Sequence, residues 1–282
     1  MPRQRVPAGM LLVAALLASC QSVDDTPDPL ARNVIDEAGL DSLLLTAGDP
    51  EQAVAYFEQA SAEEPERADL RRGHAISLRR AGRYPEAFRV YRELDSLGQA
   101  SAADLLDYGF VAVRLDRWED AASIDSRLPA GLETARRHLL SALIADQQQD
   151  WEAADAAYER AEMLSTNPAG IFNNWGVSKM SRGDFAAADG LFRRALSYDS
   201  QLFNAKNNLA LVRGLQGNYQ LPAIPMTERE RAQILHNLGV IATRREERDI
   251  ARGLFAAAVE THPQFYQEAA DKLAALEAKV EN

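Results

Sequence analysis

Alanine and aromatic residues recur along this chain at the spacing of one face of an amphipathic helix. An aromatic side chain follows an alanine by four positions in five segments, at Phe57, Tyr91, Tyr158, Phe192 and Phe255. The alanines in this register recur at nearly equal spacing, with a gap of almost two periods before the last: Ala53, Ala87, Ala121, Ala154, Ala188 and Ala251. Because residues four apart lie on the same helix face, the pattern predicts a helix with one buried face in each segment.

A second helix is predicted upstream of each alanine. A small residue recurs there, where two helices must approach closely: Ala75, Gly109, Ala142, Gly176, Ala210 and Gly239. The period of the register is roughly 34 residues, which is typical of paired-helix repeats. With these features the sequence resembles the tetratricopeptide repeat family along residues 34–265, with starts near Val34, Ala68, Ala102, Ala135, Ala169, Phe203 and Ala232.

This resemblance implies an all-α fold, a right-handed superhelix of about seven helical hairpins. In such an α-solenoid each hairpin buries its apolar face only by stacking on its neighbours. Repeat 1 departs from the family pattern with Asp41 at the close-contact position. Repeat 3 departs with Asp125 in place of the aromatic, which predicts a loose third hairpin that ends at Pro129.

Repeat 6 carries prolines where its second helix belongs. Pro222 replaces the usual alanine and Pro225 follows, and a proline inside a helix costs about 3 kcal/mol. We predict no regular helix between Gln220 and Pro225, and a new helix near Thr227, whose T-E-R-E sequence matches a capping box. The irregular segment 217–227 is either an extended plug that keeps the array continuous or a hinge.

A last helix is predicted at 264–280, after Pro263. Apolar residues recur there at helical spacing: Phe265, Ala269, Leu273, Leu276 and Val280. Charged residues lie between them, which is typical of a helix that solvates the end of a repeat array. The repeat domain is therefore expected to comprise residues 34–282.

The N-terminal segment 1–19 has the layout of a secretory signal peptide. Arg3 and Arg5 precede an apolar stretch at 10–17, and small residues precede Cys20. The stretch is too short for a bilayer, which needs about 20 residues, so cleavage is expected. Residues 20–33 contain two prolines and no apolar period, which predicts a flexible tether.

The sequence Leu17-Ala18-Ser19-Cys20 resembles the lipobox of bacterial lipoproteins. The resemblance implies cleavage before Cys20 and attachment of acyl chains such as palmitate to it. Several acyl chains give stable membrane anchoring. The position after the cysteine holds Gln21 instead of the aspartate that marks inner-membrane retention in such lipoproteins. The resemblance therefore implies an outer-membrane anchor and a body that faces the periplasm. The alternative is an ordinary secretory signal that happens to be followed by a cysteine.

Charge and residue counts restrict the chemistry. The chain has 42 acidic and 31 basic residues, a net charge of −11, which disfavours nucleic acid as a partner. Cys20 is the single cysteine, so an intramolecular disulfide cannot form. The four histidines do not cluster, and the common nucleotide, zinc-protease and serine-nucleophile motifs are absent. We expect a non-catalytic protein without cofactor or metal, and a hydrolase only if folding clusters an acid, a base or metal ligands.

The tract 207–266, with Leu221-Pro222-Ala223-Ile224-Pro225 at its centre, resembles the TadD lipoproteins of tight-adherence (Flp) pilus assembly. The lipobox and the long repeat array agree with this resemblance. It implies a role in localising and assembling an outer-membrane secretin. An adaptor for envelope proteases or cell-wall enzymes has the same anchor and fold and is the alternative.

The ninth position of each repeat unit points into the concave groove in the tetratricopeptide family, and here it is apolar in six units. These residues are Ile76, Phe110, Leu143, Val177, Leu211 and Val240. They predict a groove for an apolar or amphipathic peptide segment, with Asn173, Asn207 and His236 as flanking hydrogen-bonding groups. Arg72, Arg79 and Arg80 would make its early part basic. The alternative is that tight curvature buries the apolar row.

Overall fold

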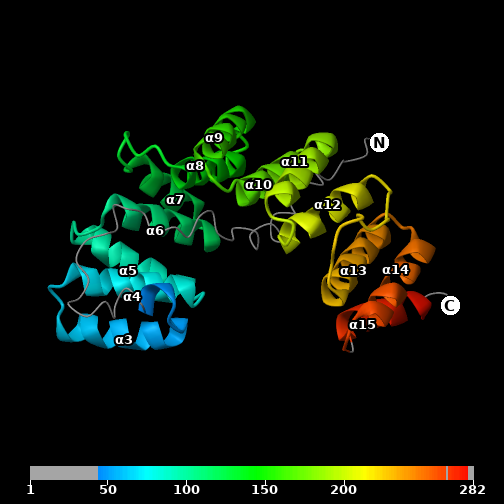
Figure 1. Cartoon of the computed structure of the whole chain (residues 1–282), viewed down its shortest axis with the longest axis horizontal. Coiled ribbons are helices and arrows are strands. Elements are labelled where there is room, and N and C mark those ends of the chain that lie inside the picture. The colour runs from blue at the N-terminus through cyan, green and yellow to red at the C-terminus, as the bar shows by residue number, and fades with distance from the viewer. Residues whose placement is uncertain (1–43, 265, 279–282) are drawn as a thin grey trace, which may run out of the picture. The chain divides into compact units, whose positions relative to one another are not determined.

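The computed structural model describes residues 44–264 and 266–278, and every regular element in these ranges is a helix. The predicted all-α fold is confirmed. The chain divides into two compact units that separate between Thr166 and Asn167. Each unit is described by itself, and Figure 1 labels the helices of both.

The first unit contains the second helix of repeat 1 and the hairpins of repeats 2, 3 and 4. Its helices are α3 Pro50–Glu63, α4 Ala68–Arg80, α5 Tyr84–Ser96, α6 Ala102–Arg114, α7 Trp118–Ser126, α8 Ala135–Gln147 and α9 Trp151–Leu164. The first helices of these three hairpins begin at the predicted repeat starts.

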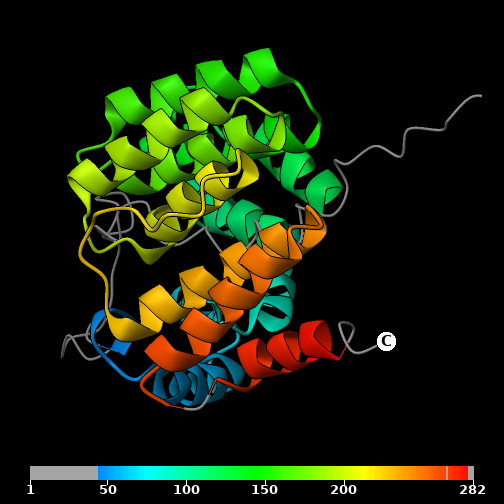
Figure 2. The same cartoon turned by 90° about the vertical axis from the view of Figure 1, so that its right-hand side faces the viewer.

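The second unit contains the hairpin of repeat 5, a single helix for repeat 6, the hairpin of repeat 7 and the cap helix. Its helices are α10 Ala169–Ser181, α11 Phe185–Tyr198, α12 Phe203–Leu215, α13 Glu228–Arg244, α14 Arg248–Thr261 and α15 Gln267–Glu277. Figure 2 shows α13, α14 and α15 packed side by side. Helix α13 begins directly after Thr227, where a new helix is predicted, and four positions before the repeat start at Ala232.

The alanine and aromatic register forms the core of both units. All six alanines of the register have no exposed surface, and the five aromatic side chains that follow them are at most 1% exposed. The small residues of the first helices are close-contact positions, as predicted. A Cβ atom on Gly176 would lie 2.6 Å from Cε1 of Phe192, and one on Gly239 would lie 2.8 Å from Cε1 of Phe255.

The third hairpin is shortened at the position of the missing aromatic. Helix α7 has 9 residues, whereas the other second helices have 13 or 14. The carboxylate of Asp125 forms an ion pair with Arg137 at the start of α8. Ser141 Oγ donates to the same carboxylate at 3.4 Å. A polar contact therefore replaces the aromatic packing of the other repeats.

The segment between α12 and α13 contains no helix, as the prolines predict. No helix lies between Gln216 and Thr227, and the predicted capping box joins Thr227 to Glu230. Pro222 is buried. Leu221 packs on buried residues of both α13 and α14. Tyr219 and Met226 pack on the same cluster of buried residues as Leu221. These contacts agree with a packed plug, and the segment lies inside the second unit.

Helix α15 covers the end of the last hairpin, as expected for a cap. Ala269 is fully buried, and Leu273 and Leu276 pack on the cluster around Phe255. The start of repeat 1 near Val34, Asp41, the signal peptide, Cys20, the tether, Phe265 and Val280 lie outside the described residues. Among the helices of the described ranges, none has both the length and the apolar character that spanning a membrane requires.

Candidate partner-binding surface

The side chains at the ninth position of the six repeat units are all partly buried and partly exposed. Each is partly exposed, although the small residue that precedes it in the helix is buried. Ile76, Phe110 and Leu143 lie on α4, α6 and α8 of the first unit. Val177, Leu211 and Val240 lie on α10, α12 and α13 of the second. We call these two sets the first and second apolar rows. None of the six side chains is buried, although Val177 and Val240 also pack on buried core residues.

Phe110 lies beside a charged group that also serves the neighbouring helix. The guanidinium carbon of Arg136 lies 5.2 Å from the centre of the Phe110 ring. Arg136 Nη2 also donates to Asp107 Oδ1 at 2.5 Å. A cation over an aromatic face is attracted to it. The aromatic member of the first row therefore lies beside a cation that Asp107 holds in place.

Asp107 is the buried carboxylate at the centre of this arrangement. Arg79 Nε lies 3.5 Å from its Oδ2, and Tyr91 Oη donates to Oδ2 at 3.3 Å. Burial raises the pKa of Asp107, but the guanidinium groups of Arg79 and Arg136 outweigh it and bring the pKa below its usual value. Asp107 thus links α4, α5, α6 and α8 in its ionised form.

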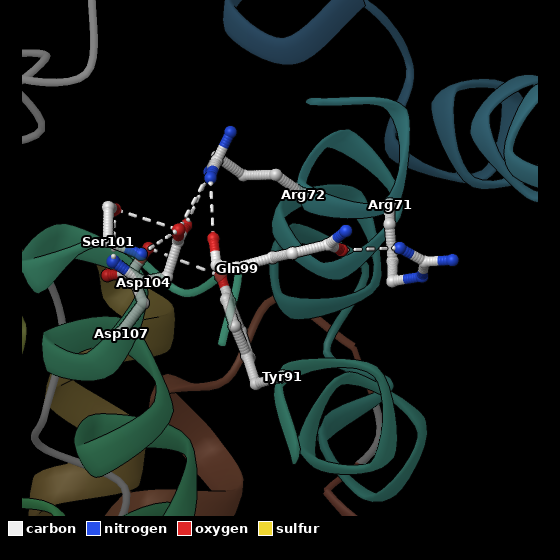
Figure 3. A network of polar contacts seen from close by, with 7 residues as sticks. All are labelled: Arg71, Arg72, Tyr91, Gln99, Ser101, Asp104 and Asp107. Carbon is white, nitrogen blue, oxygen red and sulfur yellow. Dashed lines mark hydrogen bonds and ion pairs between the residues drawn. The ribbon is translucent and has the colours of Figure 1, made fainter. Parts of the chain in front are cut away.

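A second polar network joins α4 to the start of α6 (Figure 3). Arg72 Nε donates to Asp104 Oδ2 at 2.7 Å, and Asp104 forms a capping box with Ser101. Gln99 precedes this cap. Its carbonyl accepts from Arg72 at 3.3 Å, and its side-chain Oε1 accepts from Arg71 at 2.9 Å. Two arginines of α4 therefore hold Gln99, Arg72 through its backbone carbonyl and Arg71 through its side chain.

The arginines that were expected to make the groove basic all have partners in the structure. Arg72 pairs with Asp104, and Arg79 pairs with Asp107. Arg80 donates to the backbone carbonyls of Leu44 at 2.8 Å and Gly48 at 3.0 Å. These side chains hold neighbouring repeats together. Arg72 and Arg79 are paired with carboxylates, whereas Arg80 is bonded to neutral carbonyls, so the expected basic character is only partly offset.

Side-chain amides join the first helices of the second unit. Asn208 Nδ2 donates to Asn173 Oδ1 at 3.0 Å, which links α12 to α10. Asn237 Nδ2 donates to Asn207 Oδ1 at 2.8 Å, which links α13 to α12. In each pair the fifth residue of one repeat meets the sixth residue of the next. We call a polar contact between the fifth residue of one repeat and the first helix of the next repeat, or the cap helix, a joint.

The three polar residues predicted to flank the groove all lie at joints. Asn173 and His236 are buried, with 1% and 4% of their surface exposed, and Asn207 is partly exposed. His236 faces the cap helix, where its Nε2 lies 3.3 Å from Glu268 Oε1. The structure thus gives these residues partners between successive helices, while Asn207 also retains exposed surface beside Leu211.

Two ion-pair centres were missed in the sequence. Asp107 lies in an apolar run, between Leu106 and Tyr108, and its two arginines come from the repeats before and after its own. Lys206 is 1% exposed and pairs with Glu230 at 3.1 Å. In both cases the available signal was a charged residue inside a buried helix face. Among the described residues, no group of three or more His, Cys, Asp and Glu could hold a metal ion.

Two segments of the chain match known families, and both families are described as tetratricopeptide repeats. The matches cover residues 44–103 and residues 231–262. The chain has a tetratricopeptide repeat fold. Arrays of this kind bind protein or peptide partners, and the two apolar rows occupy the first helices of its hairpins. No curated protein sequence matches the chain.

Solved structures share the tetratricopeptide repeat fold. A repeat protein from Parabacteroides merdae ATCC 43184 has 17% identity and a TM-score of 0.57, over 84% of this chain and 96% of that chain. PilW, described as a widely conserved type IV pilus biogenesis factor, has 18% identity and a TM-score of 0.53, over 86% and 99%.

A chain of the APC/C hetero-tetramer Cut9–Hcn1 has 14% identity and a TM-score of 0.58. The match covers 84% of this chain and 48% of that chain, so this chain spans about half the length of that relative. At these identities the likeness shows the fold alone.

Proposed function

We propose that this protein is a non-catalytic outer-membrane lipoprotein that binds partner proteins through its apolar rows and assists assembly of the Flp pilus secretin. The anchor in this proposal is Cys20, acylated after signal cleavage, and the repeat array faces the periplasm. The resemblance of the tract 207–266 to the TadD lipoproteins supports the pilus role. PilW, a pilus biogenesis factor, has the same fold, so pilus assembly is a function that this fold can serve.

The observation that carries the binding role is the partial exposure of all six row residues. A row that only filled the core would be buried like the neighbouring alanines and glycines. A row without a partner would leave apolar side chains at a repeated surface position, and contiguous exposed apolar surface marks interaction sites. A peptide with apolar side chains at regular spacing fits such a surface.

The membrane anchor is tested by replacing the acylated residue. Cys20→Ser removes the thiol that receives the acyl chains, so we expect the protein to leave the membrane fraction completely and to collect in the soluble periplasmic fraction. Fractionation followed by immunoblotting measures this. Persistent membrane association of Cys20→Ser, together with processing that globomycin does not inhibit, would refute the anchor.

The binding role is tested at Phe110. Phe110→Glu places a carboxylate on the first row, where Arg136 can pair with it, so we expect the melting temperature to change by only a few degrees. Partner capture should fall at least tenfold, because burying the new charge against an apolar partner is unfavourable. The measurement is the amount of secretin that co-purifies from envelope extracts.

Leu97→Glu is the matched control for Phe110→Glu. Leu97 is 53% exposed at the end of α5, a second helix, so the same charge is introduced away from the row. It should leave secretin capture unchanged. Equal loss in both variants, or a large loss of melting temperature in Phe110→Glu alone, contradicts the row as the contact surface. If deleting the protein leaves secretin multimers intact, the adaptor for envelope proteases or cell-wall enzymes replaces the pilus role.

A further inference from the structure

The joint between α13 and the cap helix α15 differs chemically from the other two joints of this unit. At the first two joints an amide donates to an amide, and neither group titrates. At the third the partners are an imidazole and a carboxylate, with His236 Nε2 3.3 Å from Glu268 Oε1. Of these three joints, the joint to the cap helix is therefore the one in which a side chain, His236, can change its charge near neutral pH.

The imidazole of His236 is enclosed on several sides. Its side chain is 5% exposed, whereas that of Glu268 is 68% exposed. The ring centres of Phe255 on α14 and Tyr266 before α15 each lie 5.4 Å from it. Its Nδ1 atom is buried and has no hydrogen-bond partner among residues 44–264 and 266–278. The site thus suits a neutral ring.

Protonation would change this site in two unfavourable ways. The imidazolium carries an N–H on both nitrogens, so Nδ1 would become a buried donor without an acceptor. The charge itself would also be removed from water, and an unpaired buried polar group costs free energy. Glu268 offsets only part of this, because an exposed carboxylate is screened by solvent.

We propose that this joint makes docking of α15 sensitive to acid, because protonation of His236 favours the state in which α15 leaves the last hairpin. The undocked state exposes the ring and gives it ordinary hydration. It also uncovers the buried surfaces of Leu235 and Ala258, which Ala269 now covers. Acid therefore opens the apolar end of the array.

The charged groups that face His236 come from α15. Burial lowers the pKa of His236 and is the largest effect, the Glu268 carboxylate raises it, and the Lys272 ammonium lowers it. Phe255 and Tyr266 contribute no charge near neutral pH. Because the docked pKa lies below the undocked value near 6.5, docking is strongest above about pH 6.5 and weakens as pH falls toward the docked pKa.

Hydrogen exchange of the full chain tests this device. Exchange is compared at pH 7.5 and pH 5.5, with times scaled for the intrinsic rates, and read in peptides within residues 266–278. We expect opening of α15 to increase in acid by up to about tenfold per pH unit below pH 6.5. His236→Asn, which places the amide of the other joints here, should abolish the increase. His262→Asn, a change at the other histidine near Tyr266, should retain it.

Two outcomes overturn the proposal. The first is an acid response that is absent in the unmodified chain or unchanged in His236→Asn. If His236→Asn frees α15 at both pH values, Glu268→Gln decides the matter. Glu268 raises the pKa of His236, so removing this carboxylate should preserve or enlarge the acid response, and a smaller response contradicts the role of His236.

Discussion

Glu230→Ala should lower the free energy of unfolding by about 3–5 kcal/mol, the range for removing one partner of a buried ion pair. Lys206 is 1% exposed, and its ammonium lies 3.1 and 3.3 Å from the two oxygens of Glu230. Without Glu230, the lysine must keep an uncompensated charge in the core or lose its proton. Urea unfolding followed by circular dichroism measures the loss.

Two further variants separate the ion pair from the helix cap. Thr227→Ala removes the other half of the capping box and should cost only about 1 kcal/mol. Lys206→Met added to Glu230→Ala should recover most of the lost stability, because a buried ion pair can be replaced by apolar groups at little cost. A Glu230→Ala loss no larger than that of Thr227→Ala would show that the ion pair contributes little.

The same ion pair shows how far the sequence alone predicts this fold. The register of alanine and aromatic residues predicted the hairpins and most helix starts, because each helix repeats one local packing problem. Pro222 and Pro225 predicted the missing helix through backbone geometry alone. The partner of Lys206 was not predictable in this way. Lys206 lies in α12 and Glu230 in α13, and the repeat register does not specify how the irregular segment between these helices brings the two charges together.

The sequence predicts which residues form the candidate surface, but it does not predict which side chains surround them. The ninth position of each repeat identified Phe110 and its five counterparts, and all six are partly exposed. Their exposure depends on the angle between successive hairpins, which no single repeat encodes. Asn173 and His236 are expected from the sequence to flank a groove, yet Asn173 meets a residue of the next repeat and His236 meets a residue of the cap helix. Such joints form between repeats, so the sequence within one repeat does not reveal them.

Asp107→Asn should lower the free energy of unfolding of the first unit by about 2–3 kcal/mol, somewhat less than the full value for a buried pair. We expect a smaller loss than for a fully buried pair because the side chains of Arg79 and Arg136 are 28% and 31% exposed. Without Asp107 they can turn toward water. Asp120→Asn is the control, because it breaks an exposed pair with Arg117 and should cost less than about 1 kcal/mol.

The pH dependence of the Asp107→Asn effect identifies its origin. The folded-state pKa of Asp107 is lowered, so its ionised form stabilises the fold fully above about pH 4 and loses this contribution as pH falls through the folded-state pKa. The stability difference between the unmodified chain and Asp107→Asn should therefore begin to shrink as pH falls below about 4, and should continue to shrink as the pH is lowered further. A difference that stays constant as the pH is lowered through this acid range would assign the loss to the hydrogen bond from Tyr91 instead. Arg136 contacts both Asp107 and Phe110. A stability difference that shrinks in acid would therefore also imply that ionised Asp107 holds the Arg136 cation beside the first apolar row.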